Sequence, residues 1–231
     1  MNIRKTSSTF AATLGIGFGL CVATSIARAD DRADPGQLTA QWWQWAFSIP
    51  SSLNPIADST GGSCMIGQSG SLWFLAGVGG PFGGSAVRAC SVPEGTTLFF
   101  PVINRVFFNS PGCGQGPENI PVKVLRKAVG DFIDSVRLRD LNVTLDNRPV
   151  FPFNRVQSDV FAIAMPANNI GGCDAGVYSP TVDDGYYVKL DPLKVGKHTL
   201  RIQAVAPGPD PLHPFTVDVT YHLTSVDVLQ K

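Results

Sequence analysis

The segments KHTLRIQAV (residues 197–205) and FTVDVTYHL (residues 215–223) decide the fold class of this chain. Apolar and polar residues alternate in both, which is typical of β-strands with one buried face. The apolar face of the first segment holds Leu200, Ile202 and Ala204, and that of the second holds every other residue from 215 to 223. Four prolines stiffen the connection between the segments, so we expect an antiparallel hairpin.

The position of the turn sets the register of this hairpin. A turn centred near residues 209 and 210 pairs Leu200 with Val219 on the buried face. On the exposed face it places Arg201 beside Asp218. Such an exposed ion pair contributes at most about 1 kcal/mol, so it serves as a marker of register.

The rest of the chain predicts six further strands and two helices. The strands are β-branched or aromatic runs at 71–76, 86–92, 97–108, 141–145, 160–165 and 186–190. One helix begins at Asp34-Pro35 and ends before Pro50; the other begins near Pro121 and should pair Lys127 with Asp131. The fold class is therefore mainly β: a disulfide-braced β-sandwich with two short amphipathic helices.

Residues 1–29 have the pattern of a signal peptide. Arg4 and Lys5 precede an apolar stretch, and Ala27-Arg28-Ala29 is a typical cleavage pattern. An uncleaved membrane anchor is the alternative, but the glycines within the stretch make a weak span. We expect a periplasmic or secreted protein without a membrane span after cleavage. The mature chain, 30–231, is expected to form a single β-rich domain, with residue 117 as a candidate sub-boundary.

Four cysteines remain after the expected cleavage: Cys64, Cys90, Cys113 and Cys173. An even number in an exported chain predicts two disulfide bonds. Three pairings are open. We favour Cys64 with Cys90, because a glycine-rich excursion separates two predicted strands there, which leaves Cys113 with Cys173. The spacing does not match a zinc site, and we expect no metal.

The charge of the chain argues against nucleic acid as a partner. Residues 1–29 hold Arg4, Lys5 and Arg28 and no acidic residue, so the 18 basic side chains fall to 15 against 18 acidic ones. A nearly neutral protein without a long basic run offers a polyanion no strong field. Export also removes cytosolic cofactors from consideration, and we expect none.

The first helix carries the best candidate binding residues. Trp42 and Trp45 fall on its apolar stripe, whereas Trp43 and Phe47, four residues apart, point elsewhere. We therefore expect Trp43 to be more exposed than Trp42 and Trp45. An aromatic patch of this kind can stack on a sugar ring or anchor a protein chain.

Catalytic and metal motifs are weaker. Gly67–Ser71 resembles a nucleophile elbow but lacks its last glycine, and the glycine cluster 77–84 is interpreted as a flexible hairpin tip. A hydrolase would need carboxylates such as Asp58 and Glu94, or His222, to converge in a cleft. Calcium could be held by acidic residues in predicted loops: Asp174, Asp183, Asp184 and Asp210.

Several short motifs resemble a group of exported bacterial proteins of uncharacterised role. They are Trp43-Gln44-Trp45, Asn54-Pro55-Ile56-Ala57-Asp58, Gly67-Gln68, Trp73-Phe74-Leu75-Ala76-Gly77 and Phe100-Pro101-Val102-Ile103-Asn104. The resemblance covers most of the mature chain and implies a bacterial periplasmic or secreted setting, but no activity. The terminal hairpin is similar to the closing strands of immunoglobulin-like sandwiches.

Two hypotheses from different classes follow. The favoured one is an exported, non-catalytic binding or surface protein, which binds a glycan or a protein through Trp43 and Phe47. The alternative is a periplasmic or secreted hydrolase that uses loop carboxylates or His222. An open aromatic patch around Trp43 would indicate the first, and a cleft where ionisable side chains converge would indicate the second.

Overall fold

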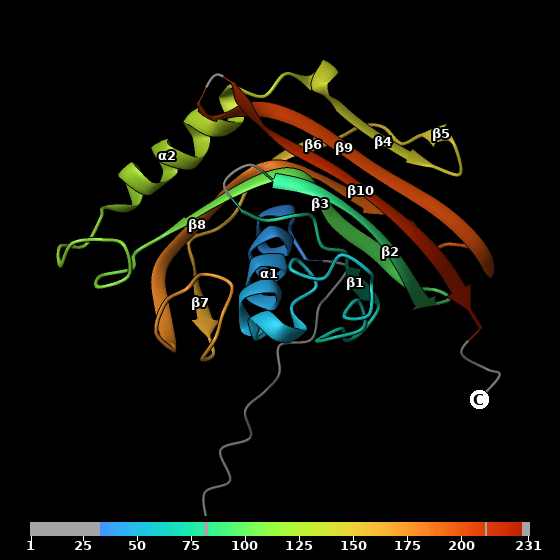
Figure 1. Cartoon of the computed structure of the whole chain (residues 1–231), viewed down its shortest axis with the longest axis horizontal. Helices are drawn as coiled ribbons and strands as arrows, with labels where there is room; N and C mark the ends of the chain where they lie inside the picture. Colours follow the sequence, from blue (N-terminus) through green and yellow to red (C-terminus); the bar gives the residue numbers. More distant parts are fainter. Residues whose placement is uncertain (1–32, 81–82, 211, 228–231) are drawn as a thin grey trace, which may run out of the picture.

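The computed structural model describes residues 33–80, 83–210 and 212–227 of the 231-residue chain. The expected signal peptide, residues 1–29, lies outside them. The described residues form two five-stranded sheets, two α-helices, and the short 3₁₀ helices η1 (Ser51–Leu53) and η2 (Leu138–Asp140), as Figure 1 shows. The prediction of a mainly β, disulfide-braced, sandwich-like fold with two helices is confirmed.

The two sheets each combine strands from distant parts of the chain. Sheet I has the order β1 (Leu72–Phe74), β3 (Thr97–Phe108), β8 (Gly176–Leu190) and β6 (Asn154–Gln157), with β7 (Phe161–Met165) also paired to β8. Sheet II has the order β2 (Gly83–Pro93), β10 (His213–Val226), β9 (Gly196–Asp210), β4 (Leu141–Leu145) and β5 (Arg148–Pro149). Strands from both sides of residue 117 therefore share both sheets.

The main hydrophobic core lies between the two sheets. Alternate residues of each strand point inward, among them Phe100 and Val188 from sheet I and Ile202 and Val219 from sheet II. Each large apolar side chain buried in this way contributes about 1.5 to 3 kcal/mol. The alternation that was visible in the sequence thus provides the contact between the sheets.

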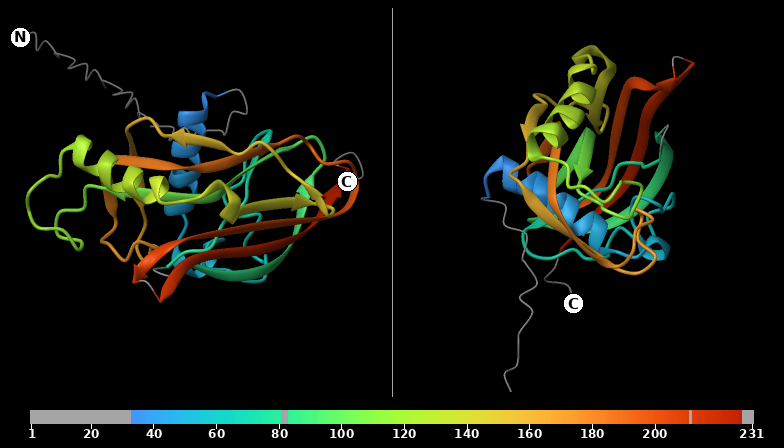
Figure 2. Two further views of the ribbon diagram at one scale, coloured as in Figure 1. Left: turned by 90° about the horizontal axis from the view of Figure 1, so that it is seen from above. Right: turned by 90° about the vertical axis from the view of Figure 1, so that its left-hand side faces the viewer.

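Helix α1 (Pro35–Ser48) packs on the opposite face of sheet I. The side chain of Asp34 caps it by accepting a hydrogen bond from the backbone N–H of Gly36 at 2.9 Å, and Pro35 occupies the first turn, as predicted. Figure 1 shows the helix beneath the arch of the strands, and Figure 2 shows that it runs across them. Trp42, 1% exposed, is buried between the helix and the sheet.

Helix α2 (Val122–Asp134) covers part of sheet I on the side turned away from α1. Its buried stripe of Leu125, Val129 and Ile133 follows the predicted period, and the first two pack against Val182 of β8. On the exposed side, the predicted pair of Lys127 and Asp131 is present at 2.6 Å. Both partners are exposed, so the pair contributes little to stability.

The terminal hairpin is antiparallel, but its register differs from the prediction by two residues. Leu200 pairs with Tyr221, and Arg201 lies opposite Thr220. Strand β9 continues through Pro207, beyond the residues that pair with β4, and β10 includes Pro214, which precedes the residues that pair with β2. A proline has no backbone N–H, but at these two positions neither β4 nor β2 requires one. The turn is displaced accordingly. Arg201 and Asp218 still share the exposed face and form a bidentate, diagonal ion pair at 2.9 and 3.0 Å.

Both favoured disulfide bonds are present. Cys64–Cys90 ties the turns after α1 to β2, and Cys113–Cys173 ties the loop before α2 to the loop between β7 and β8. Loops of these lengths imply about 3 to 4 kcal/mol of stabilisation for each bond. The two bonds indicate a non-cytoplasmic environment.

The structure extends the predicted strands in one important place. The strand predicted at 186–190 begins ten residues earlier, at Gly176. Pro180, Asp183 and Asp184 therefore lie within β8, whereas the sequence assigns the two acidic residues to a loop. The short strands β5 and β6 were also missed, since neither shows an alternating pattern. Among the described helices, none is long and apolar enough to cross a membrane.

Candidate ligand-binding cavity

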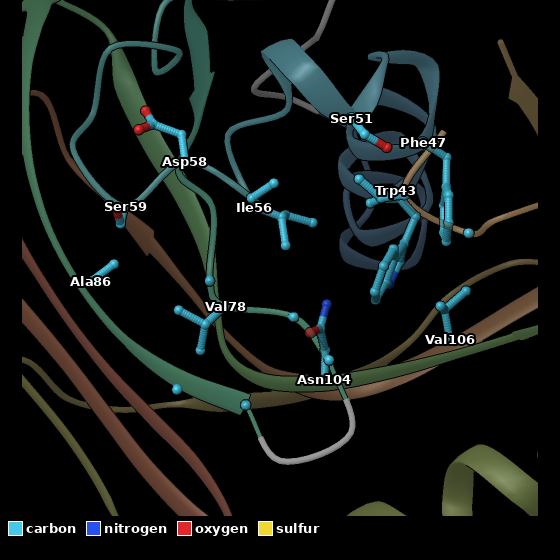
Figure 3. Close-up of a pocket in the computed structure, with 18 of the residues that line it drawn as sticks. Trp43, Phe47, Ser51, Ile56, Asp58, Ser59, Val78, Ala86, Asn104 and Val106 are labelled. Atoms are coloured by element: carbon cyan, nitrogen blue, oxygen red, sulfur yellow. The ribbon is translucent and has the colours of Figure 1, made fainter. Parts of the chain in front are cut away.

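A hollow of about 660 Å³ lies between the end of α1, the turns that follow it, and the edge of both sheets. Its volume falls within the range of about 300 to 1,000 Å³ that is usual for small-molecule sites. Figure 3 shows Trp43, Phe47, Asn104 and Val106 on one side and Asp58, Ser59 and Ala86 on the other. In this view Ile56 and Val78 lie between the two groups and add apolar side chains to the lining.

Trp43 and Phe47 form the aromatic wall of this hollow. Their rings are stacked with centroids 5.4 Å apart, and Trp42 meets Trp43 edge-on at 4.8 Å. Trp43 is the most exposed of the three helix tryptophans, as predicted, at 9% against 1% for Trp42 and 6% for Trp45. It is nevertheless buried. The two predicted binding residues therefore line a cavity and do not form an open patch.

A buried carboxyl group, that of Asp183, fixes the indole ring of Trp43 by a hydrogen bond. The indole Nε1–H of Trp43 donates to Oδ1 of Asp183 at 2.7 Å, and the hydroxyl of Tyr187 donates to Oδ2 at 2.8 Å. Tyr187 in turn accepts a hydrogen bond from Nδ2 of Asn104 at 2.9 Å. Trp43 and Asn104, which both line the cavity, are thus the two ends of one hydrogen-bond chain centred on Asp183.

Asp183 lies in the middle of β8 and is completely buried. Burial raises its pKa to about 8; the hydrogen bonds from Trp43 and Tyr187 oppose this rise, and the neighbouring charge of Asp184 adds to it. Asp184 points to the other face of the sheet, where Arg155 binds both of its carboxylate oxygens. When Asp183 is protonated and its hydroxyl donates to Tyr187, the amide of Asn104 has to turn its Oδ1 toward Tyr187 to accept the hydrogen of the tyrosine hydroxyl.

Arg88 is a buried cation beside the cavity, and all five of its N–H groups are used within the protein. They donate to the backbone oxygens of Ile56, Asp58, Ala76 and Gly77 and to the hydroxyl of Tyr221. Its guanidinium also lies 5.4 Å from the centre of the Tyr221 ring. Arg88 therefore ties the loops at the cavity to sheet II and has no donor left for a ligand.

Asp58 is occupied in a similar way. Oδ1 accepts from the backbone N–H and the hydroxyl of Thr60, and Oδ2 accepts from the backbone N–H groups of Gly61 and Ser63. Partial burial would raise the pKa of Asp58, but these hydrogen bonds lower it to about 2. Asp58 is thus a charged turn cap, and not a proton donor near neutral pH.

The other residues considered for hydrolysis do not join Asp58. Glu94 is exposed in the turn between β2 and β3, and His222 is exposed on β10; neither lines the cavity. The acidic residues considered for calcium are also dispersed, because Asp183 and Asp184 are strand residues that point to opposite faces. The described residues contain no group of three metal-ligating side chains.

The described residues of the glycine cluster 77–84, namely 77–80 and 83–84, prove to be part of the cavity wall. The prediction of a hairpin tip is wrong, because β1 belongs to sheet I and β2 to sheet II, so the segment between them crosses from one sheet to the other. Residues 77–80 also line a second hollow of about 250 Å³ beside Phe215 and Val217. A Cβ atom at Gly77 would meet no heavy atom within 4 Å, so a side chain placed there has open space.

Sequence reasoning missed Arg88, Asn104 and Tyr187, and it considered Asp183 only as a loop residue that could hold calcium. Arg88 carries a signal that could have found it, since it shares the inward face of its strand with Ala86, Cys90 and Val92. Asp183 carries none, because its partner Trp43 is 140 residues away. No family model, curated protein or solved structure matches the chain.

Proposed function

We propose that this chain is an exported, non-catalytic binding protein that holds a small molecule in the cavity beside Trp43 and Phe47. The observation that carries the proposal is an aromatic-walled hollow of about 660 Å³ whose wall is fixed by a buried hydrogen-bond chain. Binding sites of this kind are concave and mostly apolar, with a few placed polar groups. A cavity of this size favours a small molecule over a docked protein chain.

The arrangement of the ionisable groups supports binding without catalysis. Within the part of the chain that the structure describes, Asp58 and Arg88 form their hydrogen bonds with groups of the protein itself. Asp183 is bonded to Trp43 and Tyr187, and Trp43 separates it from the cavity. A general acid or base has to reach the bound substrate directly or through one water molecule. The hydrolase alternative has no comparable observation in its favour. Export is supported by the two disulfide bonds and by the expected leader, in keeping with the resemblance to exported bacterial proteins.

A substitution that fills the cavity tests this proposal. N-phenyl-1-naphthylamine, an uncharged aromatic probe, should bind the wild-type protein saturably with increased fluorescence. Gly77→Phe should raise the Kd of the probe about tenfold or more, because the new ring occupies the hollow.

Gly116→Phe is the matched control. Gly116 lies in an exposed glycine-rich loop that does not line the cavity, and a Cβ atom there also meets nothing within 4 Å. Its probe affinity should equal that of the wild type, and circular dichroism should show both variants folded. Equal affinity in wild type and Gly77→Phe, or no saturable binding in the wild type, would overturn the proposal.

A further inference from the structure

The charged groups beside the cavity limit the chemistry of its ligand. A carboxylate or phosphate would need cationic donors, yet every N–H of Arg88 already has a partner in the protein. An ammonium group would need a free carboxylate, yet Asp58 already accepts four hydrogen bonds. A charged ligand would therefore lose its hydration without gaining a charged partner.

Uncharged polar groups, in contrast, remain available around the hollow. Ser51 and Ser59 line it, and their hydroxyl groups have no hydrogen-bond partner within residues 33–80, 83–210 and 212–227. The amide of Asn104 donates from Nδ2 to the hydroxyl of Tyr187, and its Oδ1 remains available as an acceptor. Figure 3 shows these three residues on different sides of the hollow, so polar contacts are offered from several directions beside the apolar side chains that also line it.

Resting on the proposed function, we infer that the ligand of this cavity is an uncharged sugar. A sugar ring carries hydroxyl groups around its edge and an apolar C–H face, which matches a lining that combines the polar residues Ser51, Ser59 and Asn104 with Ile56, Val78 and the aromatic wall of Trp43 and Phe47. Each sugar hydroxyl can both donate and accept, so it satisfies serine hydroxyls and either orientation of the Asn104 amide.

An entirely apolar ligand fits this lining less well. It would cover Ser51, Ser59 and Asn104 without replacing the water that hydrates them. Sites with buried polar groups discriminate against ligands that leave those groups unpaired. These polar lining residues therefore favour a hydroxylated ligand over a lipid chain.

Competition with the naphthylamine probe tests the inference. Neutral mono- and disaccharides, namely glucose, galactose, N-acetylglucosamine, maltose and cellobiose, are compared with glucuronate and glucosamine, which carry a charge. At least one neutral sugar should displace the probe saturably. Its charged counterparts should bind about tenfold more weakly, because their charge has no partner in the cavity.

The double variant Ser51→Ala/Ser59→Ala should weaken that sugar about tenfold and change the affinity for the probe much less, because the lost hydroxyl groups pair with a hydroxylated ligand. Ser91→Ala, on the exposed face of β2, should change neither. If the probe binds in a manner that Gly77→Phe abolishes but no neutral sugar displaces it, the sugar assignment fails and the proposed function stands. If Gly77→Phe has no effect on the probe, both fail. Equal or tighter binding of glucuronate or glucosamine would overturn the uncharged assignment.

Discussion

The unfolding free energy of the wild-type protein should fall by about 4 kcal/mol more than that of Asp183→Asn when the pH is raised from about 5 to about 9. The folded protein holds Asp183 with a pKa of about 8, against an ordinary value of 3.8. At a pH between 3.8 and about 8, Asp183 of the folded protein keeps a proton that the unfolded chain has lost. Stability therefore decreases by about 1.4 kcal/mol per pH unit in this window.

The stabilisation that the protonated Asp183 contributes is fully present below pH 4 and is lost as the pH rises through about 8. An asparagine at this position cannot ionise, but it can still accept from Trp43 and donate to Tyr187, so the buried network can re-form. Denaturant unfolding at both pH values measures the difference. The hydrogen bond to Asp146 raises the pKa of His198, but the contribution of His198 to the pH dependence is common to both proteins.

Asp218→Asn is the control for this experiment. Asp218 is exposed and paired with Arg201, so its loss should cost less than about 1 kcal/mol. The pKa of Asp218 is lowered by that pairing, which places its titration below the window. The variant should keep the wild-type dependence on pH. The account of Asp183 would be wrong if Asp183→Asn showed the same loss of stability between pH 5 and pH 9 as the wild type.

Trp43→Ala should lower the unfolding free energy by about 3 to 5 kcal/mol and abolish binding of the naphthylamine probe. The side chain is 91% buried, stacks on Phe47 and donates to Asp183, so its removal creates a cavity and withdraws a donor from a buried carboxyl group. An exposed contact residue on the surface of the helix would instead cost less than about 1 kcal/mol.

Trp43→Phe separates the structural role of this residue from its role in binding. It keeps an aromatic ring but removes the indole N–H, so its stability should lie between those of wild type and Trp43→Ala. Phe151→Ala is the control, since Phe151 is 66% exposed and should cost at most about 1 kcal/mol. A change of less than 1 kcal/mol in Trp43→Ala would show that Trp43 is not part of the core.

The sequence predicted which residues face inward more reliably than how strands align. The faces of β9 and β10 were predicted correctly because alternation has a period of two, and a shift of two residues leaves each side chain on the same face. The register prediction is wrong because it places the turn at the prolines between the two segments, whereas the strands continue through Pro207 and Pro214. The disulfide bonds were predictable because the spacing of four cysteines left few options.

The centre of the candidate site was much less predictable. The segment 176–185 contains glycine, proline and two adjacent acidic residues, which local rules assign to loops. It forms a strand whose residues 181–185 are buried, because α1 and α2 cover the two faces there and because Trp43, Tyr187 and Arg155 satisfy the acids. The glycine cluster was likewise visible in the sequence, but only the assignment of β1 and β2 to different sheets places residues 77–80 and 83–84 at the cavity.

The central claim, that ligands enter the cavity beside Trp43, is tested most directly through the indole N–H signals of the four tryptophans. Trp42 and Trp43 line the cavity, whereas Trp45 and Trp73 do not and serve as internal controls. In ¹⁵N-tryptophan-labelled protein titrated with N-phenyl-1-naphthylamine, the Trp43 signal should shift most and saturate at the Kd of the probe, while those of Trp45 and Trp73 stay in place. Saturable fluorescence binding with an unmoved Trp43 signal, or with equal shifts at all four tryptophans, would contradict the claim.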